Sequence, residues 1–513
     1  MASKGKKVAI GCFGVMVLMC AGVPTLLWSL GGGSPNVAVD YEAKLNERAA
    51  AVPEADRAWP IYRDLVIALA ARSSDELAEL SDPAWRTAEP SEFKERIESL
   101  SDELAQIRLA ASKPGLGFVT SEKQPEAFWE AAGQEPPLDR DDASAPPVLL
   151  DMFFLPHLGQ FRSFAKLLEA DASLAARQGD GARYVSDIDA ILSIADQSEE
   201  HRTLINQLVA IAIRVMAFDR ISETLISHPD LLDEALLARV QARLSGLHGG
   251  GDYRLDMSGE QCFFYDFLQR IYTDDGNGNG RFTANGLAML SDLDGYGASS
   301  GGSGSGDPSP GARIMNGAVR LYASDRRTVT AAYENVLDGA SRWSDEPLWD
   351  RGASDEAAME TIDAASRSFP PDPGMMMVSL IVPAYSRAFT TAENLNQQRD
   401  ATAASLGVAR YRAKYGEWPG SLDELVPEFL DAVPVDRFSG EPLRYRVLAH
   451  GPVLYSVGMD RDDDGGRSAE RAMNWVPSDL VESRVAEDPA AFDGDWVFLG
   501  KEAQPGADGD AAD

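Results

Sequence analysis

The sequence predicts a mainly α-helical protein with a C-terminal α+β domain, held behind a single N-terminal transmembrane helix. Three observations predict this fold class. An uncharged apolar stretch covers Val8–Leu30, and apolar side chains recur at helical spacing from Asp40 to about Leu247. Short segments of alternating polarity follow a long helical run near the C-terminus. A chain of 513 residues is expected to hold about two to four domains beyond the anchor.

Residues 1–33 are predicted to comprise a cytoplasmic stub, residues 1–7, and a retained membrane anchor, Val8–Leu30. The stretch has about 23 residues, which would span roughly 34 Å as a helix. The hydrocarbon core of a bilayer is roughly 30 Å thick, so this length is sufficient to cross it. Lys4, Lys6 and Lys7 precede it, and the flank after it soon turns acidic. This asymmetry predicts a single-pass protein of the cell (inner) membrane, with a cytoplasmic N-terminus and a periplasmic, extracytoplasmic ectodomain.

A cleaved signal peptide and a lipoprotein are the alternatives to the anchor. A signal peptide has a shorter apolar core and a small-residue cleavage site, which the residues around Trp28 and Leu30 do not supply. A lipoprotein has a small residue before its acceptor cysteine, whereas Met19 precedes Cys20. Both alternatives therefore fit the sequence less well than a retained helix.

Charge and cysteine content limit the partners and the compartment. The net charge of −34 argues against nucleic acid, because neutralising phosphates requires basic clusters. It also argues against a chain that lies flat on anionic lipid. Of the three cysteines, Cys12 and Cys20 lie in the predicted anchor, which leaves Cys262 alone in the ectodomain. No disulfide can form within the ectodomain, so its stability must come from a sizeable core.

Two consecutive helices are predicted within the helical ectodomain, residues 34–295. Their apolar residues are Leu204, Leu208, Ile211, Val215 and Phe218 in the first and Leu232, Leu236, Leu237, Val240 and Leu244 in the second. Pro229 suits a first helical turn, and Asp230 is expected to cap the second helix. Earlier, small residues around Ala172 and a stop at Gly179 predict a helical hairpin. It is similar to one tetratricopeptide-type unit or is an ordinary hairpin, since solenoids need about three units.

Composition divides the second half of the chain. Residues 296–313 are rich in Gly, Ser and Pro, which is typical of a flexible or disordered linker. A helical segment is expected over 314–373, and the proline-rich stretch before Gly374 marks another break. Residues 501–513 are acidic and alanine-rich, and we expect a disordered tail.

The C-terminal unit begins with one long helical run, Met375–Tyr415, which ends at Gly416. Two segments of alternating polarity, Leu443–Val447 and Val453–Val457, flank a turn-prone His-Gly pair and predict a hairpin. Asp495–Phe498 would be a third strand.

The region from about 374 to 500 resembles the major pseudopilin of type II secretion, a relative of the type IV pilins. The order and spacing of the matching positions carry the resemblance: Val382, Pro383, Tyr411, Gly416, Trp418, Pro419, Pro434, Asp436, Phe438, Gly440, Pro442, Tyr445, Tyr455, Ser456 and Gly458. It covers roughly the last quarter of the chain. It implies a long helix, a small antiparallel sheet and a calcium-binding loop after the serine-containing strand.

The departures from that family bear on function. A pilin starts with a basic leader, a glycine cleavage point, a glutamate five residues in and a long apolar half-helix. Here Gly374 is followed by Met375–Ser379, so the glutamate is missing, and the apolar run ends at Pro383, too short to span a membrane. We therefore interpret the region as a pilin-like head reused as a domain, with its short apolar helix end packed against the preceding helices.

The strongest candidate metal site is the loop from Asp460 to Gly466. Asp460, Asp462 and Asp464 alternate along it, so their carboxylates can converge on one cation, while glycines allow the sharp reversal. The resemblance points to calcium here, with Ser456 and Asp495 as further contributors. The alternative is a solvated acidic hairpin loop.

A second candidate calcium loop spans residues 275–286 and follows the first eight positions of an EF-hand. Asp275, Asn277 and Asn279 occupy ligand positions 1, 3 and 5, and Arg281 would supply its carbonyl at position 7. Gly286 stands at position 12, where a bidentate glutamate should close the shell. Binding would therefore be weak, and Asn-Gly repeats also form turns without a metal.

Signatures of catalysis are few. None of the five histidines pairs at zinc-ligand spacing, and the sequence has neither a phosphate-binding glycine loop nor a nucleophile elbow. Ser163 and Lys166 match a Ser-x-x-Lys pattern without the partner motifs of penicillin-binding enzymes. We predict no catalytic residue, and no cofactor other than calcium.

These observations favour a non-catalytic envelope protein that works by contact with other envelope proteins. Two alternatives remain. One is an extracytoplasmic hydrolase whose site forms between domains and leaves no linear motif. The other is an accessory component of a secretion apparatus, which rests on fold analogy.

Overall fold

The structure is a computed structural model of the 513-residue chain. It describes residues 33–72, 90–134, 156–283, 310–350, 372–449, 451–458, 460–468 and 494–500, with a few isolated positions between them. Of the predicted anchor, only Val23 and Leu26 belong to the described residues, and the predicted tail lies outside them. Within the described ranges, no helix is both long and apolar enough to cross a bilayer.

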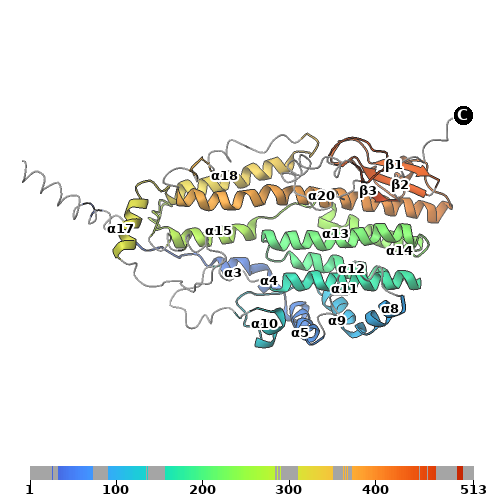
Figure 1. Cartoon of the computed structure of the whole chain (residues 1–513), viewed down its shortest axis with the longest axis horizontal. Helices are drawn as coiled ribbons and strands as arrows, with labels where there is room; N and C mark the ends of the chain where they lie inside the picture. The colour runs from blue at the N-terminus through green and yellow to red at the C-terminus, as the bar shows by residue number, and fades with distance from the viewer. Residues whose placement is uncertain are drawn as a thin grey trace, which may run out of the picture.

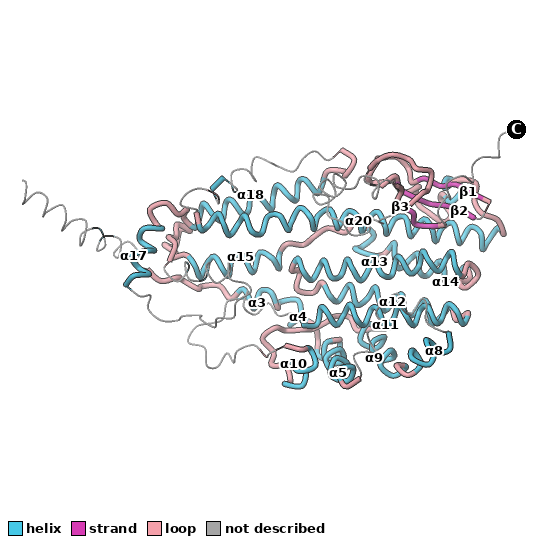
Figure 2. The backbone as a smooth tube through the Cα atoms, viewed as in Figure 1, coloured by secondary structure: helices cyan, strands magenta, loops and turns pink. Residues whose placement is uncertain are grey.

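Helices dominate the described residues, and the prediction of a mainly helical protein is confirmed (Figure 2). The α-helices are α3 (Tyr41–Leu45), α4 (Glu47–Ala51), α5 (Trp59–Ala70), α8 (Pro90–Glu98), α9 (Ser101–Ala111), α10 (Glu126–Ala132), α11 (Pro156–Gln178), α12 (Gly181–Ser198), α13 (Leu204–Ser227), α14 (Glu234–Ser245), α15 (Ser258–Ile271), α17 (Pro310–Val319), α18 (Arg326–Asp345) and α20 (Pro373–Tyr415). Short 3-10 turns are η2 (Glu54–Asp56), η5 (Leu247–Gly250) and η6 (Leu422–Leu425).

The helices stack in layers along α20, which runs nearly the length of the molecule (Figure 1). On one side α18 packs against its first half, and on the other α15 and α13 lie end to end beside it. The hairpin of α11 and α12 forms the next layer, and α5, α8, α9 and α10 the outermost. The molecule is therefore elongated, with α17 at one end and the β-sheet at the other.

The predicted helical hairpin is present as α11 and α12. Gly179 ends α11 with a positive φ of 73°, which glycine adopts without strain, and Asp180 caps α12 by accepting from the Arg183 amide. Asp171 of α11 and Asp187 of α12 are fully buried, and Arg108 of α9 pairs with both carboxylates. This buried ion pairing holds α9 against the hairpin. A tetratricopeptide-type repeat stays a prediction.

The break between α13 and α14 was predicted, but the predicted cap was wrong. Asp233, not Asp230, caps α14, because its carboxylate accepts from the Leu236 amide at 2.9 Å. The intervening turn buries Leu232 and brings the Leu231 carbonyl against Gly181, where a Cβ would approach to 2.7 Å. Because this turn packs on α12, α14 begins only at Glu234.

The long helix α20 agrees with the prediction to within two residues. Asp372 caps it by accepting from the amides of Gly374 and Met375, and Gly416, at φ 79°, ends it. Its first half contributes Met377, Val378, Tyr385 and Phe389 to a core shared with α15 and α18. Its second half contributes Leu395, Leu406 and Val408 to a core shared with α13, α14 and the sheet. One helix thus belongs to both cores.

The sheet confirms the predicted hairpin and third strand. β1 (Arg444–Leu448), β2 (Gly451–Ser456) and β3 (Trp496–Leu499) are antiparallel, with β2 in the middle. Leu454 of β2 and Phe498 of β3 join the core formed with α20. Elsewhere one boundary differs: the last four residues of the predicted 296–313 linker form the first turn of α17, whose N-terminal proline suits that position.

Candidate metal centre and neighbouring cleft

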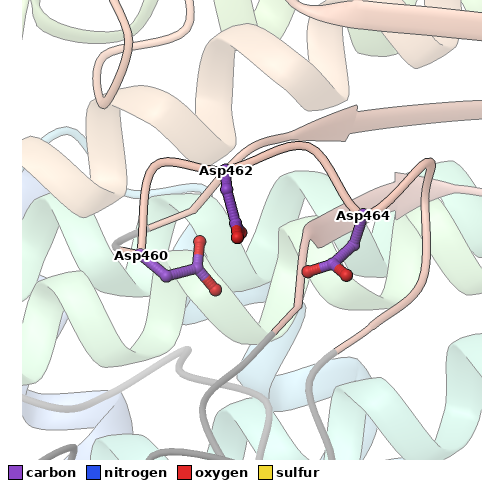
Figure 3. Close-up of side chains that lie close together, drawn as sticks. All are labelled: Asp460, Asp462 and Asp464. Carbon is purple, nitrogen blue, oxygen red and sulfur yellow. The ribbon is translucent and has the colours of Figure 1, made fainter.

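The acidic loop that follows β2 brings three carboxylates together. One carboxylate oxygen from each of Asp460, Asp462 and Asp464 lies within 4.8 Å of the others. Figure 3 shows the three side chains turned toward a common space beside the loop. Arg461, at φ 63°, makes the backbone reversal between the first two aspartates, and positive φ values at Gly465 and Gly466 make the next. The alternation in sequence therefore becomes convergence in space.

Asp460 and Asp462 are exposed and Asp464 is half-buried, and ionisation is opposed at Asp460. Burial raises the pKa of Asp460, and the charge of Asp462 adds to that effect, although the Gly494 amide donates to Asp460 at 2.9 Å. One oxygen of Asp464 pairs with Arg467, and the other is buried without a hydrogen-bond partner among the described residues. A bound cation would favour the ionised carboxylates and satisfy that oxygen.

Asp495, at the start of β3, is buried beside this loop. Its side chain is 3% exposed, its Oδ2 accepts from the Gly466 amide at 2.6 Å, and its Oδ1 has no partner among the described residues. Burial, together with the charges of Asp463 and Asp464, raises the pKa of Asp495 to about 6, although the hydrogen bond from the Gly466 amide opposes this shift. A buried carboxylate oxygen without a donor is costly unless a proton or a cation compensates it.

Ser456 belongs to a different network from the one predicted. Its hydroxyl donates to Asp436 at 2.8 Å and accepts from the Gly458 amide at 3.1 Å. Asp436 is fully buried and also accepts from the amides of Phe438 and Val457. These bonds account for Ser456 without a cation, so our proposal below omits it from the ligand set. The anchoring role of Asp436 was missed because its partners lie up to 21 residues away.

The second candidate loop is closed by its own hydrogen bonds. Asp275 accepts from the amides of Asn277 and Asn279 at 2.8 and 2.9 Å, which keeps its pKa low. The Arg281 carbonyl, the predicted position-7 ligand, accepts from the Thr273 amide at 2.9 Å, and a bridge joins the residues flanking the loop. Two arginines at the start of α18 also contact the loop, one of them at the Asn277 carbonyl.

These bonds describe a stable turn next to positive charge, an environment less suited to a cation than the loop after β2. The two candidate loops lie far apart in the structure: the 275–286 loop lies near α17, whereas the acidic loop lies beside the sheet.

Comparisons of the chain with family models, with curated proteins and with solved structures find no match. The geometry of the described residues therefore carries the argument for function.

A cleft of about 540 Å³ opens between the 252–258 segment, the end of α18 and the middle of α20. Burial opposes ionisation of Asp252, yet Arg437 and Arg399 outweigh it and lower the pKa of Asp252. The pKa of Asp256 is also lowered, since hydrogen bonds from Ser258 and nearby arginines outweigh its burial. No histidine is among the lining residues. Asp252 and Asp256 are thus paired, ionised carboxylates rather than carboxylic acids ready to give up a proton.

Proposed function

We propose that this chain is a membrane-anchored extracytoplasmic protein without catalytic activity, which works through contacts with other envelope proteins. Its C-terminal head is a pilin-like domain stabilised by calcium. The observation that carries the proposal is the packing of α20. Its first half is buried against α15 and α18, which belong to the helical body formed by α3 to α18. A helix committed to its own chain cannot also be the stem of a filament subunit.

The contacts of that first half are extensive and specific. Tyr385 is 1% exposed and its hydroxyl lies 3.3 Å from that of Tyr333 in α18. Tyr333 in turn stacks on Phe264 of α15, with ring centroids 3.6 Å apart and an interplanar angle of 9°. Asp372 fixes the start of the helix by binding both its first amides and Ser324. Freeing this half would expose the core that joins three helices.

Membrane attachment therefore falls to Val8–Leu30 in our proposal, supported by its length, its lack of charge and the lysines before it. The acidic ectodomain then lies outside the cytoplasm. An absent reaction motif and a cleft in which Asp252 and Asp256 are held ionised support a binding role over a hydrolytic one. A role as an accessory component of a secretion apparatus stays a prediction, and it would be a narrower case of the same contact-based function.

The proposed calcium ligands are Asp460, Asp462 and Asp464, with Asp495 as a buried fourth carboxylate. Calcium takes six to eight oxygen ligands, so backbone carbonyls and water would complete the shell. The site joins the loop after β2 to the start of β3, two segments that are far apart in the sequence. Binding would hold the third strand to the hairpin, and its free energy would add to the stability of the head.

We expect calcium to raise the melting temperature of the full chain in detergent by a few degrees relative to chelator. At calcium concentrations about 100-fold above Kd, a site in the folded state adds about 2.7 kcal/mol. Asp462→Ala and Asp464→Ala should each abolish the rise. Ser456→Ala and Asp275→Ala should keep it, because neither residue belongs to the proposed site.

Equal melting temperatures with calcium and with chelator would contradict the calcium proposal. Loss of the response in Asp275→Ala, with retention in Asp462→Ala, would move the site to the 275–286 loop. Scanning calorimetry is suitable, since it separates the unfolding of the head from that of the body if they are not cooperative.

The interaction role is tested by photocrosslinking in intact envelopes. The head exposes Val435 and Val447, which are 42% and 48% exposed, and a photoreactive residue at either should give a discrete adduct with another envelope protein. Leu109, which is 47% exposed on α9 of the body, is the matched control. Adducts at Leu109 that equal those at the head, or no adducts at the head, would count against partner binding by this domain.

A further inference from the structure

The end of the molecule opposite the head exposes a group of large apolar side chains. Met315 of α17 is 58% exposed, and Leu321 and Tyr322, just after that helix, are 69% and 41% exposed. Val319 of the same helix is buried in the core that includes Phe282. The α17 end is therefore fixed to the body on one side and leaves an apolar surface on the other.

The chain enters the folded body at this same end (Figure 1). Gly33 packs so closely that a Cβ there would lie 3.0 Å from Thr273 Cγ2 and 3.5 Å from the Arg320 guanidinium. The amides of Ala38 and Val39 donate to the Gln269 side chain of α15 at 3.2 and 3.1 Å. The start of the described chain is thus held along α15, beside α17.

This placement limits how far the α17 end can lie from a bilayer. The apolar stretch ends at Leu30, and the few residues from there to Gly33 reach at most about 11 Å when fully extended. With Val8–Leu30 in the membrane, Gly33 and its contact Arg320 must lie close to the headgroups. The neighbouring apolar side chains, at 315 and 321–322, then lie within reach of the bilayer surface.

We infer that the α17 end, defined by Met315, Leu321 and Tyr322, is a membrane-docking surface that rests in the interfacial region of the bilayer. This inference depends on the anchor in the proposed function. Leucine and methionine gain from transfer out of water, and tyrosine is enriched at the interface because its ring is amphipathic.

The local charge agrees with a lipid surface as the partner. The chain carries a net charge of −34, but the described residues at this end set Arg281, Arg320, Arg326 and Arg327 against Asp274, Asp275, Asp325 and Asp372. Because these described charges balance, they do not add to the repulsion that anionic headgroups exert on the rest of the chain.

Docking at this end would set the orientation of the whole ectodomain. The 43 residues of α20 correspond to about 65 Å of helix, and they lead from the α17 end toward the sheet. A body resting on α17 would hold the head, with its acidic loop, tens of ångströms from the membrane. The head would then be presented to partners deeper in the compartment.

The test uses the full chain in vesicles of phosphatidylcholine and phosphatidylglycerol, with Cys12, Cys20 and Cys262 replaced by alanine. An environment-sensitive fluorophore is placed at Leu321→Cys, at Met315→Cys as a second site, or at Val447→Cys on the head as the matched control. Lipids with a nitroxide near the headgroup should quench the 315 and 321 probes several-fold more than the 447 probe. Their emission should also be blue-shifted.

Flotation of the vesicles distinguishes failure of the proposed anchor from failure of the proposed docking surface. A chain that does not float refutes the anchor, and the docking surface with it. A chain that floats while both probes remain in water, like the 447 probe, overturns docking alone. Probes that are blue-shifted but not quenched by lipid would place protein on this surface, which also overturns the inference.

Discussion

Replacing Arg214 by methionine is expected to lower the free energy of unfolding by about 3–5 kcal/mol. Arg214 lies in α13 and is 1% exposed. Its guanidinium donates to Glu199 at 2.6 Å and to Asp196 at 2.8 Å. Burial opposes its charge, but the attraction of Glu199 and Asp196 outweighs burial and raises the pKa of Arg214. Methionine would leave Oε1 of the buried Glu199 carboxylate without its donor, while Arg202 still pairs with Oε2 at 3.2 Å, and this lost partner is the main cost.

Urea unfolding of the full chain in detergent measures this loss. Arg239→Met is the matched control, because Arg239 pairs with Asp189 at 2.5 Å but is 60% exposed, and exposed pairs contribute about 0–1 kcal/mol. Adding Glu199→Gln to Arg214→Met should recover part of the loss by removing a buried carboxylate charge that would be left with Arg202 alone. A loss no larger than that of Arg239→Met would refute the buried ion pair.

Local sequence signals predicted the secondary structure well because their physical causes are local. Gly179 and Gly416 end helices through positive φ, and both stops were predicted. The hairpin of β1 and β2 follows from residue alternation on either side of a turn. Alternating aspartates in the acidic loop were likewise predicted to converge, since the geometry depends on only five consecutive residues.

Features that depend on distant contacts could not be predicted in the same way. Asp233 replaces Asp230 as the cap because the turn before it packs against α12. Ser456 binds Asp436, 20 residues away, and the burial of Asp495 depends on the pairing of β3 with β2, which are far apart in the sequence. The buried pairing of Arg214 with Glu199 requires two helices to fold together. Each of these features is a property of packing rather than of a local pattern.

Histidine burial is a second such feature, and it predicts a dependence on pH. His157 is fully buried among Trp59, Phe118 and Phe161, and neither of its ring nitrogens has a hydrogen-bond partner among the described residues. His201 lies beside it, with ring centroids 6.5 Å apart. Burial lowers the pKa of His201 from 6.5 to about 4. Burial, together with the charge of the other histidine, lowers the pKa of His157 well below its usual value.

We therefore expect the chain to lose stability as the pH falls from about 6.5 toward about 4. Below 6.5 the unfolded chain takes up protons at these histidines, while the folded chain does not, so protonation favours unfolding. Because each unit of pKa difference corresponds to about 1.36 kcal/mol, His201 alone should cost about 2 kcal/mol at pH 5. His157 should add to that loss.

Urea unfolding between pH 7.5 and pH 5, with chelator present so that the acidic loop stays metal-free, measures this slope. The double variant His157→Phe, His201→Phe should flatten the slope, because phenylalanine fills the aromatic cluster without titrating. His228→Gln, at a half-buried position beside Ser227, should leave the slope as it is in the unaltered chain. If the double variant loses stability on acidification as steeply as the unaltered chain, carboxylates rather than this histidine pair govern the acid sensitivity. If its slope is flatter, the packing of α5, α11 and the end of α12 around two neutral imidazoles sets the lower pH limit of the fold.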